Sequence, residues 1–330
     1  MTKKFKFAVI GCGRMGSRRM RTIVDHPDTE LISVTDVNRD IAEGFSEKFE
    51  CHSSSDFKEA INDDEVDCVV VSIPNKFHAP VSIAALENGK HVFCEKPLAR
   101  NPKEAFAMVE AAKRNGCFLK TGSNLRHFPS VEKAVNLVEQ GEIGKILYLR
   151  GWVGNSGKHV NDSWYSRIDM AGGGTFLDNG VHLLDLTRLF LGEIKTCLGE
   201  VTTSYWPIAP LEDNGFGIFH ASNGQMAFIQ SSWTEWAGYM YMEIYGSDGC
   251  INIDNRNHQC ITTFVEKSGE KRIFDFSLLP PQSYDQEFEA YVKALREGRQ
   301  PLASGFDGMR AVQMAYGVYE SARTKRVAHI

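Results

Sequence analysis

The sequence predicts two domains, an α/β domain built on a parallel sheet and an α+β domain with a large, mostly antiparallel sheet. Three observations carry this prediction. Strand and helix patterns alternate through the first part of the chain, which indicates parallel strands joined by helices. Short strand patterns separated by tight-turn residues dominate the second part. All 5 Trp and all 10 Tyr lie at or after Tyr148, so the two parts also differ in composition.

Five short, β-branched and largely apolar segments in the first part have the pattern of strands buried on both faces of a parallel sheet. These segments are Phe5–Gly11, Leu31–Asp36, Val66–Pro74, His91–Glu95 and Phe118–Gly122. Helical patterns lie between them, over Met15–Asp25, Ile41–Phe49, Ala79–Asn88 and Pro102–Asn115. Alternating strands and helices with short connections predict βαβ units and a doubly wound sheet.

The second part mixes helices with hairpins. Helical patterns are expected over Pro129–Glu139, Phe176–Leu191, Tyr284–Arg296 and Gly308–Arg323. The pair Asn223-Gly224 lies between two strand patterns and is a strong signal for an antiparallel hairpin. The length of 330 residues agrees with two domains. We therefore expect domains at residues 1–123 and 124–330.

Composition and charge argue against several classes of protein. The formal net charge is −5, without a run of five or six like charges, which disfavours nucleic acid as a partner. No apolar run reaches the ~18 residues of a membrane span, and no signal-peptide pattern follows the first lysines. The 8 Cys form no CxxC pair and no metal-ligand spacing. We therefore expect reduced thiols in the cytoplasm and no bound metal.

A G-x-G-x-x-G motif, Gly11, Gly13 and Gly16, connects the first predicted strand to the first predicted helix. These glycines would permit a tight turn, the approach of a pyrophosphate, and close packing of helix on strand. Asp36 lies 36 − 16 = 20 residues after the last glycine, where a Rossmann dinucleotide-binding domain holds its ribose-binding acid. A carboxylate there repels a 2′-phosphate, which favours NAD over NADP, although nearby arginines could bind one. The alternative is an ordinary glycine turn with a solvated aspartate.

Three further motifs, taken together with this fingerprint, resemble those of the Gfo/Idh/MocA oxidoreductases, a family that includes glucose–fructose oxidoreductase and inositol dehydrogenase. They are Ile73-Pro74-Asn75-x-x-His78, the run from Gly89 to Glu95-Lys96-Pro97, and Gly172-Gly173-Gly174-x-x-x-Asp178-x-Gly180-x-His182. The resemblance extends over nearly the whole chain. It implies catalytic roles for Lys96, Asp178 and His182. It also implies a second domain that binds substrate and forms a homodimer or homotetramer.

The fingerprint and the resemblance together define an expected cofactor site. Its members are Gly11, Gly13, Arg14, Met15, Gly16, Asp36, Ser72, Pro74, Asn75, His78, Glu95 and Lys96. Turn and cap roles would explain Pro74, Asn75 and His78 equally well.

Aromatic and basic residues that flank the predicted cleft are candidates for substrate binding, because aromatic faces suit C–H-rich sugar rings. The expected substrate contacts are Lys96, Arg126, Trp152, Trp164, Arg167, Asp178 and His182, with Tyr165 in the same segment. Trp and Tyr at strand spacing could equally pack a sheet or an interface.

The spacing of the three catalytic candidates suggests a division of labour. Asp178 and His182 stand four residues apart on a predicted helix, so both face one side. Lys96 follows a strand at the carboxyl edge of the parallel sheet, and Pro97 could place it through a cis peptide. We expect His182 to act as general base, Asp178 to orient it, and Lys96 to polarise the substrate oxygen. Lys96 could itself be the base if its pKa were lowered, and Asp185, one turn further, is expected to be structural.

The leading hypothesis is an NAD(H)-dependent dehydrogenase that oxidises a secondary alcohol of a sugar, cyclitol or sugar derivative by hydride transfer to nicotinamide. One alternative is an NAD-dependent glycosidase that uses transient oxidation, although such relatives tend to be longer and secreted. Another is a non-catalytic NAD-binding sensor or regulator, although such relatives lose the Lys/Asp/His set that this chain keeps. The sequence contains neither the G-x-S-x-G motif of serine hydrolases nor the H-E-x-x-H motif of metalloproteases.

Overall fold

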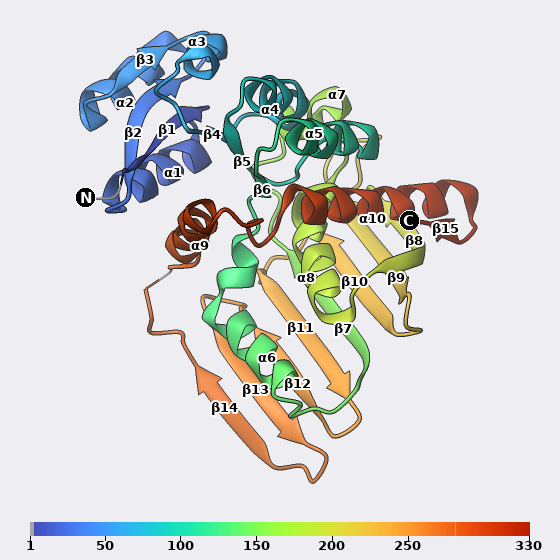
Figure 1. The fold of residues 1–330 in the computed structure, drawn as a ribbon. Helices are drawn as coiled ribbons and strands as arrows, with labels where there is room; N and C mark the ends of the chain where they lie inside the picture. Colours follow the sequence, from blue (N-terminus) through green and yellow to red (C-terminus); the bar gives the residue numbers. More distant parts are fainter. Residues whose placement is uncertain (1–2, 281) are drawn as a thin grey trace. The chain divides into compact units, whose positions relative to one another are not determined.

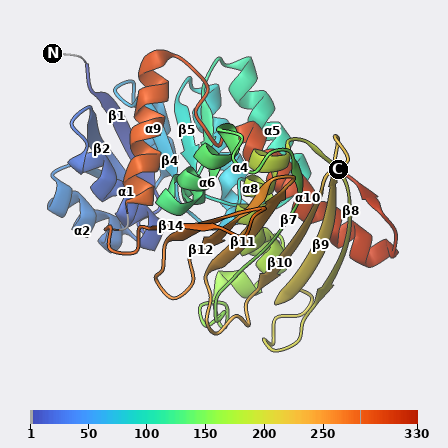
Figure 2. The same cartoon turned by 90° about the horizontal axis from the view of Figure 1, so that it is seen from below.

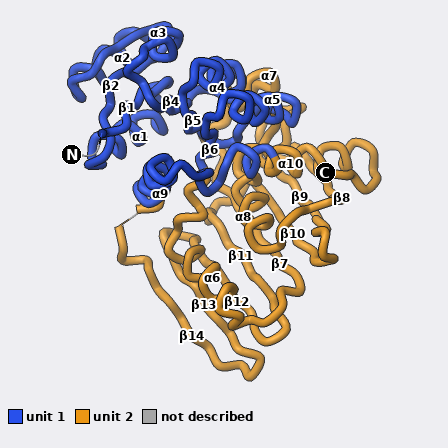
Figure 3. Tube along the Cα trace, viewed as in Figure 1, with its two compact units in different colours: residues 1–122, 284–309 blue, residues 123–283, 310–330 orange. Residues whose placement is uncertain are grey.

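The computed structural model describes residues 3–280 and 282–330 (Figure 1). The chain divides into two compact units, each in its own colour in Figure 3. Unit 1 comprises residues 1–122 and 284–309, and unit 2 comprises residues 123–283 and 310–330. The expected domains, 1–123 and 124–330, had placed residues 284–309 in the second domain, and the structure assigns them instead to unit 1.

Unit 1 contains a six-stranded sheet in the order β3-β2-β1-β4-β5-β6, and all its strand pairs are parallel, as predicted. The strands are β1 Phe5–Ile10, β2 Thr29–Thr35, β3 His52–Ser54, β4 Cys68–Val71, β5 His91–Cys94 and β6 Leu119–Thr121. The helices are α1 Arg14–Asp25, α2 Arg39–Phe49, α3 Phe57–Asn62, η1 Asn75–Phe77, α4 His78–Glu87, α5 Pro102–Arg114 and α9 Ser283–Glu297. Neither β3 nor α3 was expected, because segments of three and six residues are too short to show a period.

Helix α9 belongs to unit 1 because its aromatic face packs into the core of the parallel sheet. The ring of Phe288 lies 5.3 Å from that of Phe7 on β1, and Tyr291 lies 5.4 Å from Phe93 on β5. All four side chains are fully buried. Burial of an aromatic ring contributes about 1.5–3 kcal/mol, so the helix completes a core that the earlier residues do not close alone.

Unit 2 contains a nine-stranded sheet in the order β14-β13-β12-β11-β7-β10-β9-β8-β15. Its strands are β7 Ile146–Gly154, β8 Ile194–Thr202, β9 Asn214–Ala221, β10 Met226–Ser232, β11 Met240–Gly246, β12 Gly249–Asp254, β13 Ile261–Glu266, β14 Lys271–Asp275 and β15 Ala328–His329. The sheet is antiparallel except where β7 pairs with β10. The hairpin predicted at Asn223-Gly224 is present between β9 and β10, and the predicted α+β class is confirmed.

Helices cover one face of this sheet. In Figures 1 and 2, α6 Pro129–Glu139 and α8 Val181–Leu191 lie along the same face, and α10 spans Gly305–Thr324. The remaining short turns are η2 Asn124–His127, η3 Trp164–Ser166, α7 Ile168–Ala171 and the π-helix η4 Phe176–Gly180. The helix expected over Phe176–Leu191 is therefore divided into a π turn and α8. None of the helices in the described part of the chain is both long and apolar enough to cross a membrane.

Candidate active site

The glycine-rich loop between β1 and α1 has the shape that its motif predicts. Gly11 has φ +97°, and an added Cβ would overlap the carbonyl oxygen of Ser72. An added Cβ at Gly16 would overlap the carbonyl oxygen of Gly11. At Gly13, by contrast, no atom of a described residue beyond its chain neighbours and the adjoining helix backbone lies within 4 Å of an added Cβ. Two glycines thus allow close packing, and the third leaves its backbone open to a ligand.

The start of α1 fits a pyrophosphate. Gly13 is the N-cap of α1, and among the described residues no side chain caps it. The first N–H groups of a helix and its dipole attract an anion. Arg14 is exposed and Met15 is half-buried in this first turn, so both predicted cofactor contacts lie on the open side of the loop. The loop and the helix start therefore match the phosphate-binding part of a dinucleotide site.

Asp36 is held at the end of β2 by two backbone groups. Its carboxylate accepts hydrogen bonds from Cys12 N–H and Asn38 N–H, both at 2.9 Å. The first of these bonds fixes the carboxylate beside the glycine loop. Arg39, which could have attracted a 2′-phosphate, donates to Glu43 at 2.8 Å and is exposed. The carboxylate of Asp36 at this place is suited to accept hydrogen bonds from ribose hydroxyls.

The loop after β4 contains the next group of predicted cofactor contacts. The N–H of Ser72 donates to Ile10 across the sheet at 2.8 Å, and Asn75 is buried as the first residue of η1. The carbonyl of Pro74 accepts the N–H of Phe77 at 2.9 Å. These contacts show the turn role for Pro74, and direct cofactor contact by Ser72, Pro74 and Asn75 stays a prediction.

His78, another predicted cofactor contact, is buried between two backbone carbonyls. Its side chain is 1% exposed, and both ring nitrogens face backbone carbonyls, Nδ1 that of Pro97 and Nε2 that of Ile73, each at 2.8 Å. Burial lowers the pKa of His78 below its ordinary value. Both ring nitrogens thus face carbonyls within the fold, and cofactor contact by His78 stays a prediction.

Glu95, Lys96 and Pro97 follow β5 at the carboxyl edge of the parallel sheet. The Lys96–Pro97 peptide is cis, as the sequence suggested, and Lys96 is half-buried. The carboxylate of Glu95, which is 7% exposed, accepts from Arg19 Nε at 2.7 Å. An added Cβ at Gly122 would lie 2.8 Å from Glu95 Oε2, so that glycine makes room for the carboxylate.

Arg19 belongs to a buried group of four charges within unit 1. It also donates to Glu287 of α9 at 2.8 Å, and Lys120 Nζ lies 3.2 Å from Glu287. Arg19, Glu287 and Lys120 are almost completely buried. Two positive and two negative groups balance one another, which is the condition for burying charges at tolerable cost. No local pattern indicates this group, because its members come from four separate segments.

In unit 2, Asp178 lies on the π turn and His182 in the first turn of α8, and both are nearly buried. Asp178 Oδ2 accepts from Trp233 Nε1 at 3.3 Å. The Nε2 atom of His159 lies 4.0 Å from the same oxygen. The His159 ring meets those of Tyr165 and Trp233 edge-on, at 4.9 and 6.0 Å. Asp178 therefore lies at the edge of a group of three rings, those of His159, Tyr165 and Trp233, which we call the aromatic wall.

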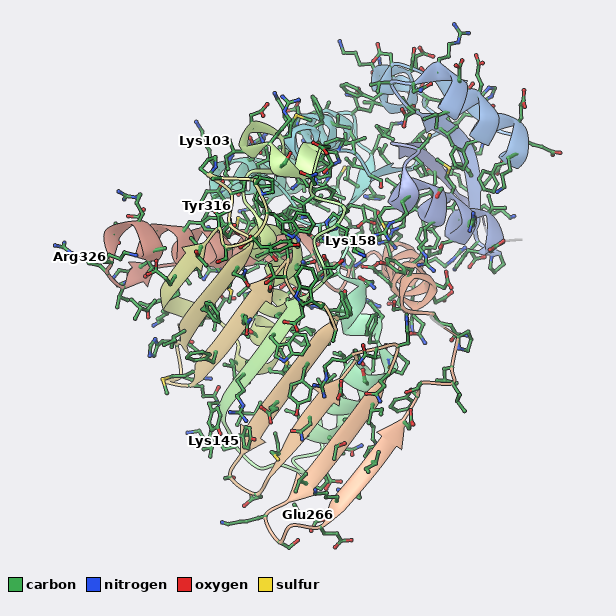
Figure 4. All side chains as sticks on the ribbon, turned by 180° about the vertical axis from the view of Figure 1, so that it is seen from behind. Lys103, Lys145, Lys158, Glu266, Tyr316 and Arg326 are labelled. Carbon is green, nitrogen blue, oxygen red and sulfur yellow. The ribbon has the colours of Figure 1, made fainter. Side chains whose placement is uncertain are left out.

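Glu212 fixes the start of the π turn that carries Asp178. Its carboxylate accepts from Gly174 N–H and Phe176 N–H, both at 2.9 Å, and from Tyr319 Oη at 2.8 Å. The preceding loop is tied to α10 as well, because Tyr316, labelled in Figure 4, donates to the carbonyl of Gly172 at 3.0 Å. Burial raises the pKa of Glu212. An acid that accepts the first amides of a turn also stabilises its positive end.

Comparison with known proteins agrees with this geometry. A family model described as "Oxidoreductase family, NAD-binding Rossmann fold" matches residues 5–123, and one described as "GFO/IDH/MocA C-terminal domain" matches residues 131–252. A myo-inositol 2-dehydrogenase from Thermotoga maritima is 30% identical over 335 residues, which cover 97% of each chain. The chain belongs to the Gfo/Idh/MocA family. The predicted family, the oxidoreductase class and the NAD-binding Rossmann fold are thereby confirmed.

Other relatives point in the same direction. A scyllo-inositol 2-dehydrogenase (NAD(+)) from Bacillus subtilis is 27% identical over 331 residues, covering 98% of this chain and 95% of the relative. The structure of a levoglucosan dehydrogenase in complex with NADH and levoglucosan matches with a TM-score of 0.92 and 24% identity, over 99% of both chains. At that identity the structural match shows a shared fold.

Two predicted substrate contacts of this Gfo/Idh/MocA protein have other surroundings in the structure. Arg126 donates two hydrogen bonds to the carboxylate of Asp185, at 2.7 and 2.6 Å, and both side chains are nearly buried. Its charge is therefore balanced within the fold, and Asp185 has the structural role expected of it. An added Cβ at Gly151 would lie 3.3 Å from Leu183 of α8, so the next residue, Trp152, points to the opposite sheet face. Trp152 does not gather with the residues near α8.

The other aromatic candidates lie in the segment that leads to the Gly172–Gly174 loop. The rings of Trp164 and Tyr165 stack with centroids 3.8 Å apart, and Tyr165 contacts His159. Arg167 is exposed and donates to Asp169 at 3.3 and 3.1 Å. The structure thus places Tyr165 in the aromatic wall beside Asp178, whereas it shows Arg167 only with its neighbour.

The sequence motifs did not predict His159 and Trp233 as neighbours of Asp178. They lie 19 residues before and 55 residues after Asp178 in the chain, so no local spacing connects them with it. The density of aromatic and polar residues around His159 was the available signal. In the described residues no group of three or more His, Cys, Asp and Glu side chains could hold a metal ion.

Proposed function

We propose that this protein is an NAD(H)-dependent dehydrogenase that oxidises a secondary alcohol of a sugar, cyclitol or sugar derivative. The observation that carries the proposal is that Asp178 and His182, four residues apart across the junction of the π turn and α8, are both nearly buried beside the aromatic wall. The two inositol dehydrogenases named above support the substrate class.

In this proposal unit 1 binds the cofactor. The backbone of the Gly11–Gly16 loop and the start of α1 hold the pyrophosphate, and Asp36 accepts hydrogen bonds from the adenosine ribose. Bound NAD⁺ supplies the acceptor for the hydride of the substrate carbon. Lys96 donates a hydrogen bond to the substrate oxygen and stabilises negative charge that develops there.

Unit 2 supplies the groups that handle the proton. His182 accepts the hydroxyl proton, since a histidine exchanges protons near neutral pH. Asp178 stabilises the resulting imidazolium, and Trp233 Nε1 holds one carboxylate oxygen in place. The rings of His159 and Tyr165 offer the substrate an apolar face next to a polar atom, which suits the C–H and O–H groups of a sugar ring. A lysine base is the alternative, in which Lys96 and His182 exchange roles.

The experiment is a screen for NADH formation with inositols, monosaccharides, anhydro sugars and nucleotide sugars, each with NAD⁺ and with NADP⁺. We expect turnover of at least one polyol, with a higher kcat/KM for NAD⁺. Intact NADH binding without turnover of any substrate would refute the enzymatic proposal. Release of an aglycone without net NADH would indicate the glycosidase instead. Near-normal turnover of His182→Asn with an inactive Lys96→Met would assign the base to Lys96.

We further propose a homodimer or homotetramer that forms through the face of the nine-stranded sheet opposite α8. Strand register places Tyr148, Leu198, Phe216 and Phe228 on this face, and all four are exposed. Several exposed large apolar side chains on one sheet face favour a partner surface. Light scattering that gave a monomer at micromolar concentration would contradict it.

The eight free cysteines support a cytoplasmic location.

A further inference from the structure

His78 connects the two loops that leave the carboxyl edge of the parallel sheet at β4 and β5. Its ring nitrogens each lie 2.8 Å from a carbonyl oxygen, that of Ile73 in the loop after β4 and that of Pro97 in the loop after β5. The two strands are neighbours, with Val71 paired to Cys94, so the loops start side by side. An imidazole between two acceptors can donate to either of them.

The same contacts restrain the segment that carries Lys96. On its N-terminal side, Glu95 is held by Arg19 at 2.7 Å. On its C-terminal side, the carbonyl oxygen of Pro97 lies 2.8 Å from Nδ1 of His78. Lys96 lies between these two anchors. Both anchors are buried in unit 1, so the segment does not depend on solvent-exposed contacts for its position.

We propose that His78 is a positioning residue for Lys96, which ties the peptide after Lys96 to the loop after β4 and thereby sets the location of the ammonium group. The proposal rests on the proposed dehydrogenase function. It gives His78 a task other than touching the cofactor, because both nitrogens face the backbone. Positioning matters at such a site because a displacement of about 1 Å can cost on the order of 100-fold in rate.

His78→Phe tests the proposal, because it keeps a ring in the buried space and removes both ring nitrogens, including the N–H donor. His91→Phe is the matched control. His91 lies at the other end of β5, where its ring stacks on Phe118 at 5.1 Å and Nδ1 accepts from Phe118 N–H. We expect His78→Phe to lower kcat by at least about tenfold, with the NADH dissociation constant within about threefold of wild type. The deuterium isotope effect on kcat should rise, because hydride transfer becomes slower. His91→Phe should change none of these.

A second measurement needs no turnover. Reductive methylation of the intact protein, followed by peptide mass spectrometry, reports how accessible Lys96 is. Release of the Lys96 segment predicts faster labelling of Lys96 in His78→Phe than in wild type or His91→Phe. His78→Gln, whose amide can donate a hydrogen bond, should restore part of both properties and replaces His78→Phe if that variant does not fold.

The outcomes separate the proposal from the function on which it rests. If the wild type oxidises no substrate, the proposed function fails and the labelling of Lys96 decides the role of His78. If the wild type is active and His78→Phe matches His91→Phe in kcat and labelling, the positioning role is wrong. A weaker NADH affinity of His78→Phe with unchanged kcat would contradict the positioning role and indicate that His78 contacts the cofactor directly.

Discussion

Alanine substitution at Gly13 and Gly16 should separate cofactor binding from folding. At Gly16 an added Cβ would overlap the carbonyl oxygen of Gly11 and lie 2.9 Å from its carbon. Both contacts are with backbone, so α1 and the loop would have to move apart, and overpacking of this kind costs about 1–3 kcal/mol. At Gly13 the same methyl group meets no described atom within 4 Å, and φ is −69°, which alanine adopts freely. The loss there is that of a helix N-cap glycine, up to about 1 kcal/mol.

The two variants therefore have opposite expectations in two assays. In urea unfolding, Gly16→Ala should lose about 1–3 kcal/mol, and Gly13→Ala at most about 1 kcal/mol. In NADH fluorescence titration, the methyl group at Gly13 occupies the open side of the loop where the pyrophosphate would approach. If that overlap also costs about 1–3 kcal/mol, the dissociation constant of Gly13→Ala rises roughly 5- to 150-fold. Unchanged NADH affinity of Gly13→Ala, or wild-type stability of Gly16→Ala, would refute the reasoning.

Three further substitutions test other parts of the site. Asp36→Asn removes the charge that repels a 2′-phosphate, so the ratio of kcat/KM for NAD⁺ over NADP⁺ should fall by roughly tenfold; an unchanged ratio would show that Asp36 does not select the cofactor. Glu212→Gln turns an acceptor into an amide donor against backbone N–H groups and should cost about 1–3 kcal/mol near pH 5. Because burial raises the pKa of Glu212, the wild type loses stability as the pH rises above about 4.5 and through that raised pKa, and the variant should lack this slope in urea titrations. Arg126→Leu leaves Asp185 buried without its partner and should cost about 3–5 kcal/mol, most of which Arg126→Leu/Asp185→Leu should recover; equal stability of the single and double variants would exclude the pair as the cause.

The features that the sequence predicted correctly are those set by nearby residues. The turn at Gly11, the close packing at Gly16 and the end of β2 at Asp36 follow from motif spacing over a few tens of residues. The cis peptide before Pro97 is likewise a local property. Alternation of strand and helix predicted the parallel sheet, because buried parallel strands need apolar runs and helices between them.

The features that were missed or misplaced depend on contacts between distant segments. The pattern of α9 predicted a helix, but nothing in that pattern showed that Phe288 and Tyr291 pack against unit 1. Arg126 is predicted to contact the substrate, and no local pattern showed that Asp185 pairs with it. His78 fitted a cofactor motif, and only the paths of two loops show that its nitrogens meet backbone carbonyls.

Local patterns are sufficient to identify the side chains that this oxidoreductase has for its chemistry and the place of each along its strand, turn or helix. Periodicity and motif spacing are sufficient for that, because they act over one or two turns of backbone. The packing of distant segments determines which of those side chains already have hydrogen-bond or ion-pair partners within the protein. Arg126 pairs with Asp185, and His78 lies between two backbone carbonyls. Asp178 has His159 and Trp233 as neighbours. Partners of this kind are set by how distant segments pack, which no local pattern records.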